Sequence, residues 1–189
     1  SLTIGPKVNK LQKYMFNWLA ITSITIPANV TIIDEFAFDN CSKLSTVIIE
    51  ESNNDLKIIG DSPFYESPLT SISYNRPVRN FNSSLNLITP NSSQGIFAIN
   101  SDFMDEISTT LTIGDNITVI PEYMFAYLPI TEVTIKTPVY HIANNAFIGC
   151  EKLATIDIKP DSDPIRIGYQ LYASQEYGPF YDSPLTKIK

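Results

Sequence analysis

Few residues in this sequence could carry catalytic chemistry. His141 is the single histidine, so a Cys-His or Ser-His-Asp site would have to use it. It stands in a Val-Tyr-His-Ile stretch that is typical of a strand. Cys150 follows nine residues later, at a position that recurs along the chain as an inward, apolar one, where burial would raise the pKa of the thiol. We therefore expect no nucleophilic active site and no enzyme.

Metal-binding residues are also too dispersed to form a site. One histidine and two distant cysteines do not supply the ligands of a zinc site. Asp161-Ser-Asp163 and Asn53-Asn-Asp55 offer oxygen ligands, but neither has the spacing of an EF-hand loop with its terminal Glu, and both are typical of polar turns. A pair of catalytic carboxylates stays open, because the sequence singles none out. We predict no metal and no cofactor.

The elements that would position any site are copies of one short unit. Its strand pattern is apolar-x-x-apolar-x-apolar, as in Ile21-x-x-Ile24-x-Ile26. The middle apolar residue recurs at positions 2, 24, 47, 72, 111, 133, 156 and 188, and steps of 22 and 23 residues lie in the range of leucine-rich solenoids. Each unit also supplies one phenylalanine, and we predict that these form one column: Phe16, Phe38, Phe64, Phe97, Phe125, Phe147 and Phe180.

A longer duplication overlies the short repeat. LTIGPKV from Leu2 matches LTIGDNI from Leu111 at an offset of 109, and PFYESPLT from Pro63 matches PFYDSPLT from Pro179 at an offset of 116. The seven additional residues fall in an insertion at 169–177. The other irregular part is the long unit 73–109, which is rich in Asn, Ser and Pro and which we expect to leave the solenoid as a loop or hairpin.

The pattern I-T-I-P-x-x-V-T-x-I-x-x-x-A-F-x-x-C-x-x-L, read from Ile24, resembles the BspA-type (Treponema-type) leucine-rich repeats. These are common in surface and secreted proteins of Bacteroides and its relatives and also occur in some protozoan parasites. The resemblance covers nearly the whole chain in about seven units. It implies a mostly β solenoid of the α/β-type repeat class, right-handed, with a parallel sheet on the concave face and turns or 3-10 segments on the convex face. It also implies a non-catalytic module at the cell surface or outside the cell, which adheres to host or neighbouring-cell proteins such as those of the extracellular matrix.

Composition limits the domain count and the partner class. A chain of 189 residues that is 43% hydrophobic can bury one sizeable core, so we expect a single domain over 1–189. A net charge of −7 argues against nucleic acid or an anionic membrane as partner, since both attract clustered Lys and Arg. No apolar run is long enough to insert into a membrane. Because the chain opens inside a strand without a signal sequence or polar capping repeats, we expect a segment of a longer exported protein.

The two cysteines test the stacking model. Cys41 and Cys150 occupy equivalent places four repeats apart. At about 4.8 Å per stacked strand they should lie roughly 19 Å apart, whereas a disulfide needs Cα atoms within about 7 Å. We predict two free, buried thiols that act as small apolar fillers.

Strand geometry places a set of hydroxyl side chains on the outer face of the sheet. The candidate binding residues there are Thr25, Thr46, Ser71, Thr110, Thr112 and Thr134. Thr suits an exposed strand for structural reasons alone, so a plain exposed sheet and a flat hydroxyl surface that binds a protein or glycan are both open. An ice-binding ladder is a third alternative, but Ile48, Glu132 and Asp157 interrupt it.

Aromatic residues in the irregular parts are the other candidates. The insertion at 169–177 carries Tyr169, Tyr172 and Tyr177, and Tyr is enriched at interface hot spots because it joins an apolar ring to a hydroxyl. The alternative is that these rings fold back over the last repeat. Trp18 follows the first Phe of the column, and we expect it to cover the N-terminal core.

Two functions fit this sequence. The first is a binding module for a protein partner, and the second is a spacer that presents another domain of a longer surface protein. An exposed aromatic or apolar patch on the sheet or in the insertion would favour binding. A polar sheet with apolar ends would favour the spacer.

Overall fold

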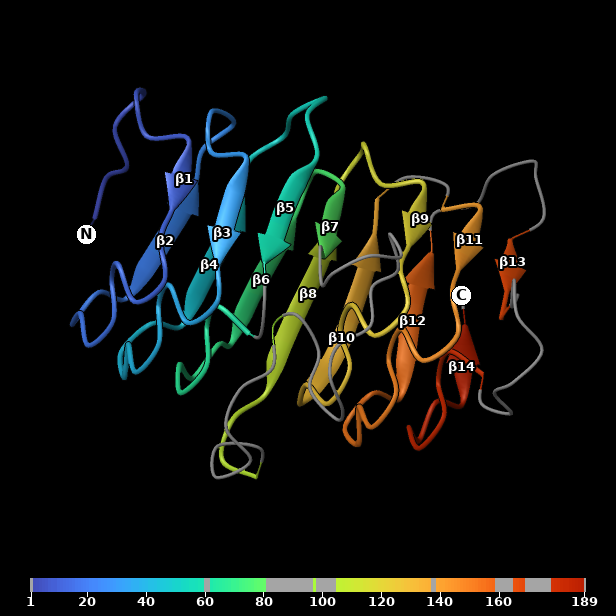
Figure 1. Ribbon diagram of the computed structural model, residues 1–189. Helices are drawn as coiled ribbons and strands as arrows, with labels where there is room; N and C mark the ends of the chain where they lie inside the picture. The colour runs from blue at the N-terminus through green and yellow to red at the C-terminus, as the bar shows by residue number, and fades with distance from the viewer. Residues whose placement is uncertain are drawn as a thin grey trace.

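The chain winds into a stack of similar levels, with its N-terminus at one end and its C-terminus at the other (Figure 1). A computed structural model describes residues 2–59, 62–80, 97, 105–136, 139–158, 165–168 and 178–188. Each level runs through a strand of a main sheet, a corner, a shorter strand on the opposite side, and a turn that leads to the next level. The predicted β-solenoid of repeats is confirmed. The described residues include no helix that could cross a membrane.

The main sheet consists of seven parallel strands in the order β14-β12-β10-β8-β6-β4-β2. They are β2 (Ser23–Ile26), β4 (Thr46–Ile49), β6 (Ser71–Tyr74), β8 (Thr109–Ile113), β10 (Ile130–Ile135), β12 (Thr155–Ile158) and β14 (Lys187–Ile188). Neighbours in the sheet are neighbours in the repeat, so consecutive units stack side by side. The long unit does not interrupt the sheet, because Ile72 of β6 pairs directly with Leu111 of β8.

The opposite side carries short strands where we expected only turns or 3-10 segments. One sheet contains β1 (Lys10–Leu11), β3 (Ile32–Asp34), β5 (Leu56–Ile59) and β7 (Val78–Asn80), and a second contains β9 (Val119–Ile120), β11 (His141–Ile142) and β13 (Arg166–Ile167). The physical reason is the β-branched Val and Ile of these stretches, which favour extended backbone. Because β6 and β7 belong to the regular stack, the long unit 73–109 begins inside the solenoid. The loop or hairpin that we expect in this unit falls mostly on residues outside the described ones.

A turn forms the third side of each level, as in residues 35–40. Its backbone is hydrogen-bonded to the next level: the amide of Phe16 donates to Ala37 O at 2.8 Å, and that of Trp18 donates to Asp39 O at 3.0 Å. Tyr14 and Trp18 have positive φ angles of 57° and 59°. Consecutive levels are therefore bonded to each other on all three sides.

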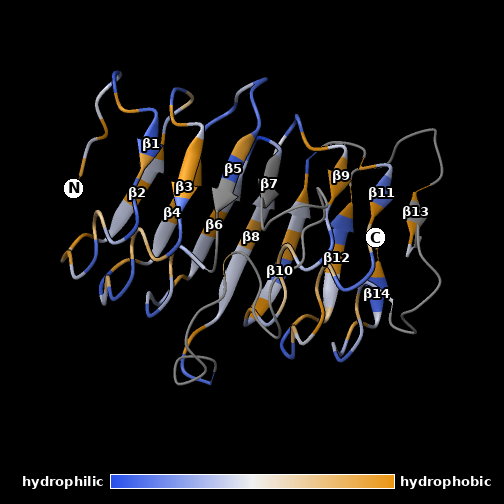
Figure 2. Ribbon diagram, viewed as in Figure 1, coloured by the Kyte–Doolittle hydropathy of each residue, from blue (hydrophilic) through white to orange (hydrophobic). Residues whose placement is uncertain are grey.

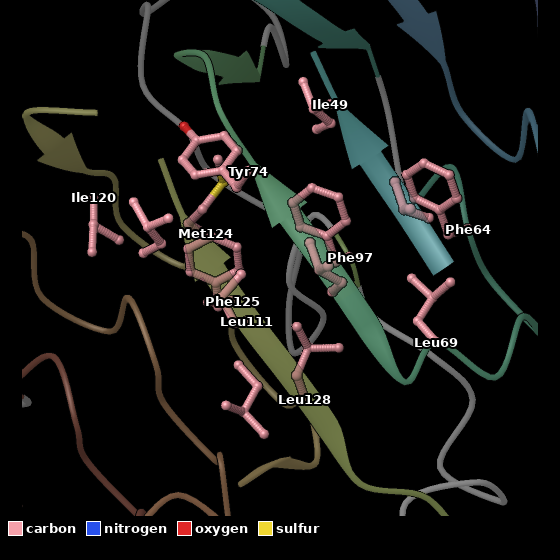
Figure 3. Close-up of a cluster of buried hydrophobic side chains, with 14 of the residues drawn as sticks. Ile49, Phe64, Leu69, Tyr74, Phe97, Leu111, Ile120, Met124, Phe125 and Leu128 are labelled. Carbon is pink, nitrogen blue, oxygen red and sulfur yellow. The ribbon is translucent and has the colours of Figure 1, made fainter. Parts of the chain in front are cut away.

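The predicted phenylalanine column is confirmed. Centroids of successive rings lie 5.2 to 5.8 Å apart, from Phe16 through to Phe180. Phe97, from the middle of the irregular unit, takes its expected place between Phe64 and Phe125. Leucines of successive levels surround these rings (Figure 3). The core is thus one continuous cluster along the stack.

The free cysteines are also confirmed, with an addition. Cys41 and Cys150 are both buried and unpaired. Each thiol donates to the carbonyl of a column phenylalanine, Cys41 Sγ to Phe16 O and Cys150 Sγ to Phe125 O, both at 3.1 Å. The two cysteines therefore act as hydrogen-bond donors between levels, and not only as apolar fillers.

One predicted strand is wrong. Residues 2–4 do not join the main sheet, although Leu2 and Ile4 pack against the core. The copy at Leu111–Ile113 is paired with β6 on one side and β10 on the other. Within the described chain, residues 2–4 could pair with a strand on one side only. They therefore lack half of the strand pairing that holds Leu111–Ile113 in the sheet.

Candidate binding surface on the main sheet

The outward side chains of the main sheet form two rows that run across its strands. Strand pairing places the first row in the order Ser23, Thr46, Ser71, Thr110, Glu132, Thr155 and Lys187. The second row is Thr25, Ile48, Ser73, Thr112, Thr134 and Asp157. Parallel strands in register align equivalent positions of each copy. The repeat in the sequence therefore becomes a continuous surface.

The structure brings most of the predicted hydroxyl residues together. Thr46, Ser71 and Thr110 are neighbours on three consecutive strands, β4, β6 and β8. Thr112 and Thr134 are neighbours on β8 and β10. Thr25 lies in the second row but is separated from the latter pair by Ile48 and Ser73. In Figure 2 the ribbons of the strands from β2 to β10 carry pale segments of intermediate hydropathy beside orange, hydrophobic ones.

Several of these hydroxyl groups are available to a ligand. Thr110 is exposed, and the other predicted residues of the face are half-buried. Thr110 Oγ1 donates a long bond of 3.4 Å to Thr70 O. Among the residues that the structure describes, the hydroxyls of Thr46, Ser71 and Thr112 form no such bond within the chain. Ile48 is the large apolar side chain that breaks the surface, at 37% exposure.

An acidic depression interrupts the hydroxyl rows towards the C-terminal end of the sheet. It has a volume of about 310 Å³ and is lined by Thr131, Glu132, Val133, Thr155 and Asp157. The register between β10 and β8 slips between Ile130 and Glu132, and bulges of this kind redirect side chains on a sheet. Glu132 of β10 pairs with Thr155 of β12 in the first row, and Asp157 lies on β12 two residues after Thr155. This end of the sheet can therefore accept a cationic or hydroxyl-bearing group.

Sequence reasoning missed the depression. It recorded Glu132 and Asp157 only as interruptions of a threonine pattern, and a bulge of one residue leaves no pattern by which to recognise it. The described residues contain no cluster of three or more His, Cys, Asp or Glu that could hold a metal ion. The three tyrosines, Tyr169, Tyr172 and Tyr177, lie outside the described residues.

The groups with perturbed pKa values are scattered and lie off this surface. Burial raises the pKa of Cys150 to about 12 and also raises that of Cys41, which leaves both as protonated thiols. Burial likewise raises the pKa of Glu122, and a hydrogen bond from Asn145 partly opposes it. His141 lies in β11, on the side of the level opposite the main sheet. These groups do not converge on one pocket in the described chain.

Exposed apolar side chains gather on the first turn instead of on the sheet. Trp18 is 73% exposed, with Tyr14, Met15 and Leu19 beside it in the sequence at 36% to 46%. The expectation that Trp18 covers the N-terminal core is wrong, because Phe16 supplies the ring that stacks on the core. The exposure of Trp18 could have been predicted from the sequence, since each level needs only one ring in the phenylalanine column and Phe16 already supplies it.

Comparison with known families gives one match. The BspA type leucine-rich repeat region matches in six copies, over residues 1–91 and 79–175. No curated protein matches the chain, and no solved structure does.

Proposed function

Because the chain belongs to the BspA-type leucine-rich repeat family, we propose that it is a protein-binding module of a secreted or cell-surface protein. Its role is adhesion to a protein of a host or of a neighbouring cell. Repeat solenoids use extended faces for such contacts. The observation that supports this most is the unbroken run of hydroxyl side chains across β4, β6 and β8.

This surface suits a protein partner for three reasons. Threonine is stiff at χ1, so little side-chain entropy is lost when a partner binds. Each hydroxyl can both donate and accept a hydrogen bond. The seven strands, at about 4.8 Å each, give a face roughly 30 Å long, so that one partner can contact several levels at once.

Negative charge at one part of the face would fix the orientation of a bound partner. Glu132 and Asp157 lie at the C-terminal end of the hydroxyl rows, beside the depression. Complementary charge orients a partner and raises its association rate more than it raises affinity. A partner with a basic group at one edge of its contact surface fits this arrangement. Tyr169, Tyr172 and Tyr177 are proposed as a second contact that adds aromatic area.

The experiment is a binding assay against immobilised fibronectin, laminin and collagen. Thr112→Lys with Thr134→Lys places two long charged side chains at the centre of the face, and affinity should fall more than tenfold. Thr118→Lys is the matched control, since Thr118 is exposed and lies outside the main sheet. A deletion of 169–177 measures the tyrosine contact separately. Binding that survives both changes would reject this surface.

The second candidate function is a spacer within a longer surface protein. It is favoured by the polar sheet and by the exposed apolar side chains near both ends of the stack, such as Trp18 and Ile188. A spacer needs rigidity and no ligand. If the wild-type chain binds none of the immobilised proteins and the face variants alter no activity of the parent protein, the spacer is the better assignment.

A further inference from the structure

The second outward row of the main sheet contains a polar strip with a different kind of side chain at each end. Its middle consists of Ser73, Thr112 and Thr134, on β6, β8 and β10. Ile48 of β4 lies next to Ser73, and Asp157 of β12 lies next to Thr134. The three hydroxyl residues are half-buried, whereas Ile48 and Asp157 are exposed. The strip therefore runs between an apolar and an anionic side chain.

The internal duplication shows that the two ends depart from the repeat at one and the same position. Ile48 and Asp157 are 109 residues apart, which is the offset between the two blocks. All other copies that strand pairing aligns in this row carry Ser or Thr. Strand propensity favours Thr at such a position. The two blocks thus present the same surface with an apolar group on one copy and a charge on the other.

The anionic end of the strip is recessed. Asp157 and Glu132 line the depression of about 310 Å³ together with Thr131 and Thr155. In the part of the chain that the structure describes, neither carboxylate takes part in an ion pair. Complementary charge then comes from a ligand. An arginine fits better than a lysine, because its planar guanidinium presents several N–H groups to carboxylates on two strands.

The apolar end of the strip has the surroundings of an interface anchor. Ile48 is 37% exposed. Its neighbours in the row are Thr25 and Ser73, and Thr46 lies two residues earlier on the same strand. A lone exposed apolar side chain is normal on a protein surface. An apolar group enclosed by polar ones that exclude water is, however, the arrangement found at binding hot spots.

The distance between the two ends limits the shape of a ligand that contacts both. Four strand steps separate β4 from β12 (Figure 1), or roughly 19 Å at about 4.8 Å per step. An extended chain covers this length in about six residues. A helix is about 10 to 12 Å wide, whereas the two outward rows lie only roughly 7 Å apart along each strand. A helix would therefore lie across both rows, and an extended chain fits along one.

The middle of the strip offers hydrogen bonds to the main chain of such a ligand. The hydroxyls of Thr112 and Thr134 can each donate or accept. Ser73 Oγ accepts a hydrogen bond from Asn75 Nδ2 at 2.9 Å. Because this bond occupies the oxygen from one side, the Ser73 hydroxyl can donate its own proton to a carbonyl of the ligand. These groups bind a peptide main chain without regard to its side chains.

We propose that the strip binds an extended segment of the partner that crosses the strands from β4 to β12. An apolar side chain of this segment packs against Ile48. An arginine about six positions away enters the depression and pairs with Glu132 and Asp157. This assignment rests on the proposed function, since it names the chemistry of the ligand that the main sheet takes.

Short synthetic peptides test the spacing. The first set carries Leu and Arg six positions apart, in either order, on a background of Ser and Gly. The second set carries them three positions apart, which spans about 10 Å and is too short to reach both ends of the strip. Isothermal titration calorimetry should give an affinity about tenfold higher for the better peptide of the first set. Peptides that do not bind, or that bind equally at both spacings, would overturn the proposal.

Variants of the chain test which side chain meets which. Ile48→Ser and Asp157→Thr each introduce a residue that other copies carry at this position, and circular dichroism checks that both are folded. Replacement of Leu by Ala in the peptide should weaken binding to the wild type but not to Ile48→Ser. Replacement of Arg by Ala should weaken binding to Asp157→Thr less than to the wild type. Thr25→Ser, one strand outside the strip, is the control. Fully additive losses would contradict the assigned contacts.

These outcomes can be told apart from those of the adhesion assay. If a matrix protein binds through the sheet but the peptides show no preference for spacing, adhesion stands and the extended segment is wrong. If the spacing preference holds but no matrix protein binds, the strip stands and adhesion to those proteins is wrong. The variant with Thr112→Lys and Thr134→Lys should lose the peptide. Unchanged peptide binding to it would place the peptide elsewhere and overturn the proposal.

Discussion

Replacement of Arg76 should show how strongly the three levels from β2 to β7 depend on one buried side chain. Arg76 is completely buried at the corner between β6 and β7. Its guanidinium reaches back to the corner between β2 and β3, where Nη1 donates to Ala28 O at 3.0 Å and Nη2 donates to Val30 O at 2.7 Å. A longer bond of 3.3 Å goes to Pro27 O. One side chain therefore connects the level of β6 and β7 to that of β2 and β3, two levels away.

The expected cost of Arg76→Met follows from these contacts. Two carbonyls lose charge-assisted bonds, that of Val30 at a buried position and that of Ala28 at a part-buried one. Each unsatisfied buried acceptor costs about 1 to 3 kcal/mol. Removal of the cation offsets part of this cost, because burial disfavours the charged form of Arg76 and lowers its pKa. The nearby Glu50 charge opposes this lowering of the pKa. We expect the free energy of unfolding to fall by about 2 to 4 kcal/mol.

Urea denaturation followed by circular dichroism measures this change. Arg76→Lys is the matched control, because it keeps the charge but cannot reproduce the fork that reaches two carbonyls, so it should lie between Arg76→Met and the wild type. Replacement of buried ionic groups by apolar ones is sometimes stabilising. If Arg76→Met proved as stable as the wild type, satisfaction of the corner carbonyls would not be the reason for the buried arginine.

Three further predictions concern single side chains. Gly149→Ala should destabilise the fold by about 2 to 4 kcal/mol, since Gly149 has a φ of +66° and an added Cβ would lie 2.4 Å from the Tyr127 ring. Gly178→Ala is the control, because a Cβ there would meet nothing within 4 Å. Equal midpoints of the two variants in thermal melts would refute this. The Cys150 thiol, with a pKa raised to about 12 by burial, should react with a maleimide only at the rate of unfolding, and rapid labelling of the native chain would contradict its burial. Glu122 has a folded-state pKa above its ordinary value of 4.5, so its contribution to stability is present below that pH and is lost as pH rises through the folded pKa. Glu122→Gln should therefore raise the melting midpoint at pH 7 but not at pH 4, and a pH-independent difference would exclude this cause.

The regular part of the fold could be predicted because it rests on local periodicity. Phe97 is the clearest case, since the spacing of the other rings placed it in the column although its own unit is irregular. The short strands on the opposite side could not be predicted with the same security, because two to four residues are too few to show a period. The contacts of Arg76 could not be predicted for a different reason. Its acceptors lie 46 to 49 residues away, and no sequence pattern links a basic residue to carbonyls at that separation.

The candidate surface divides in the same way. The hydroxyl rows follow from the repeat, whereas the depression depends on a bulge at Thr131 that only the strand pairing reveals. Trp18 was placed wrongly because its exposure depends on whether another turn lies beside it, and its sequence is almost the same as that of the covered copy at Tyr127. Burial in a stack is a property of the neighbouring level as much as of the residue.

In a stack of copies, the side chains that break the repeat tell most about binding. The threonines of the sheet recur because a strand favours them, so their presence alone carries little information about a partner. Glu132 and Asp157 break both rows at the depression, and strand propensity disfavours Asp and, to a smaller degree, Glu.

Glu132→Thr with Asp157→Thr restores the repeat. We expect this double variant to be at least as stable as the wild type, because like charges on adjacent strands are removed, but to bind a basic partner more weakly and with a smaller dependence on salt. Calorimetric melts and binding at two ionic strengths measure both effects. Unchanged salt dependence would mean that the acidic end of the sheet takes no part in recognition.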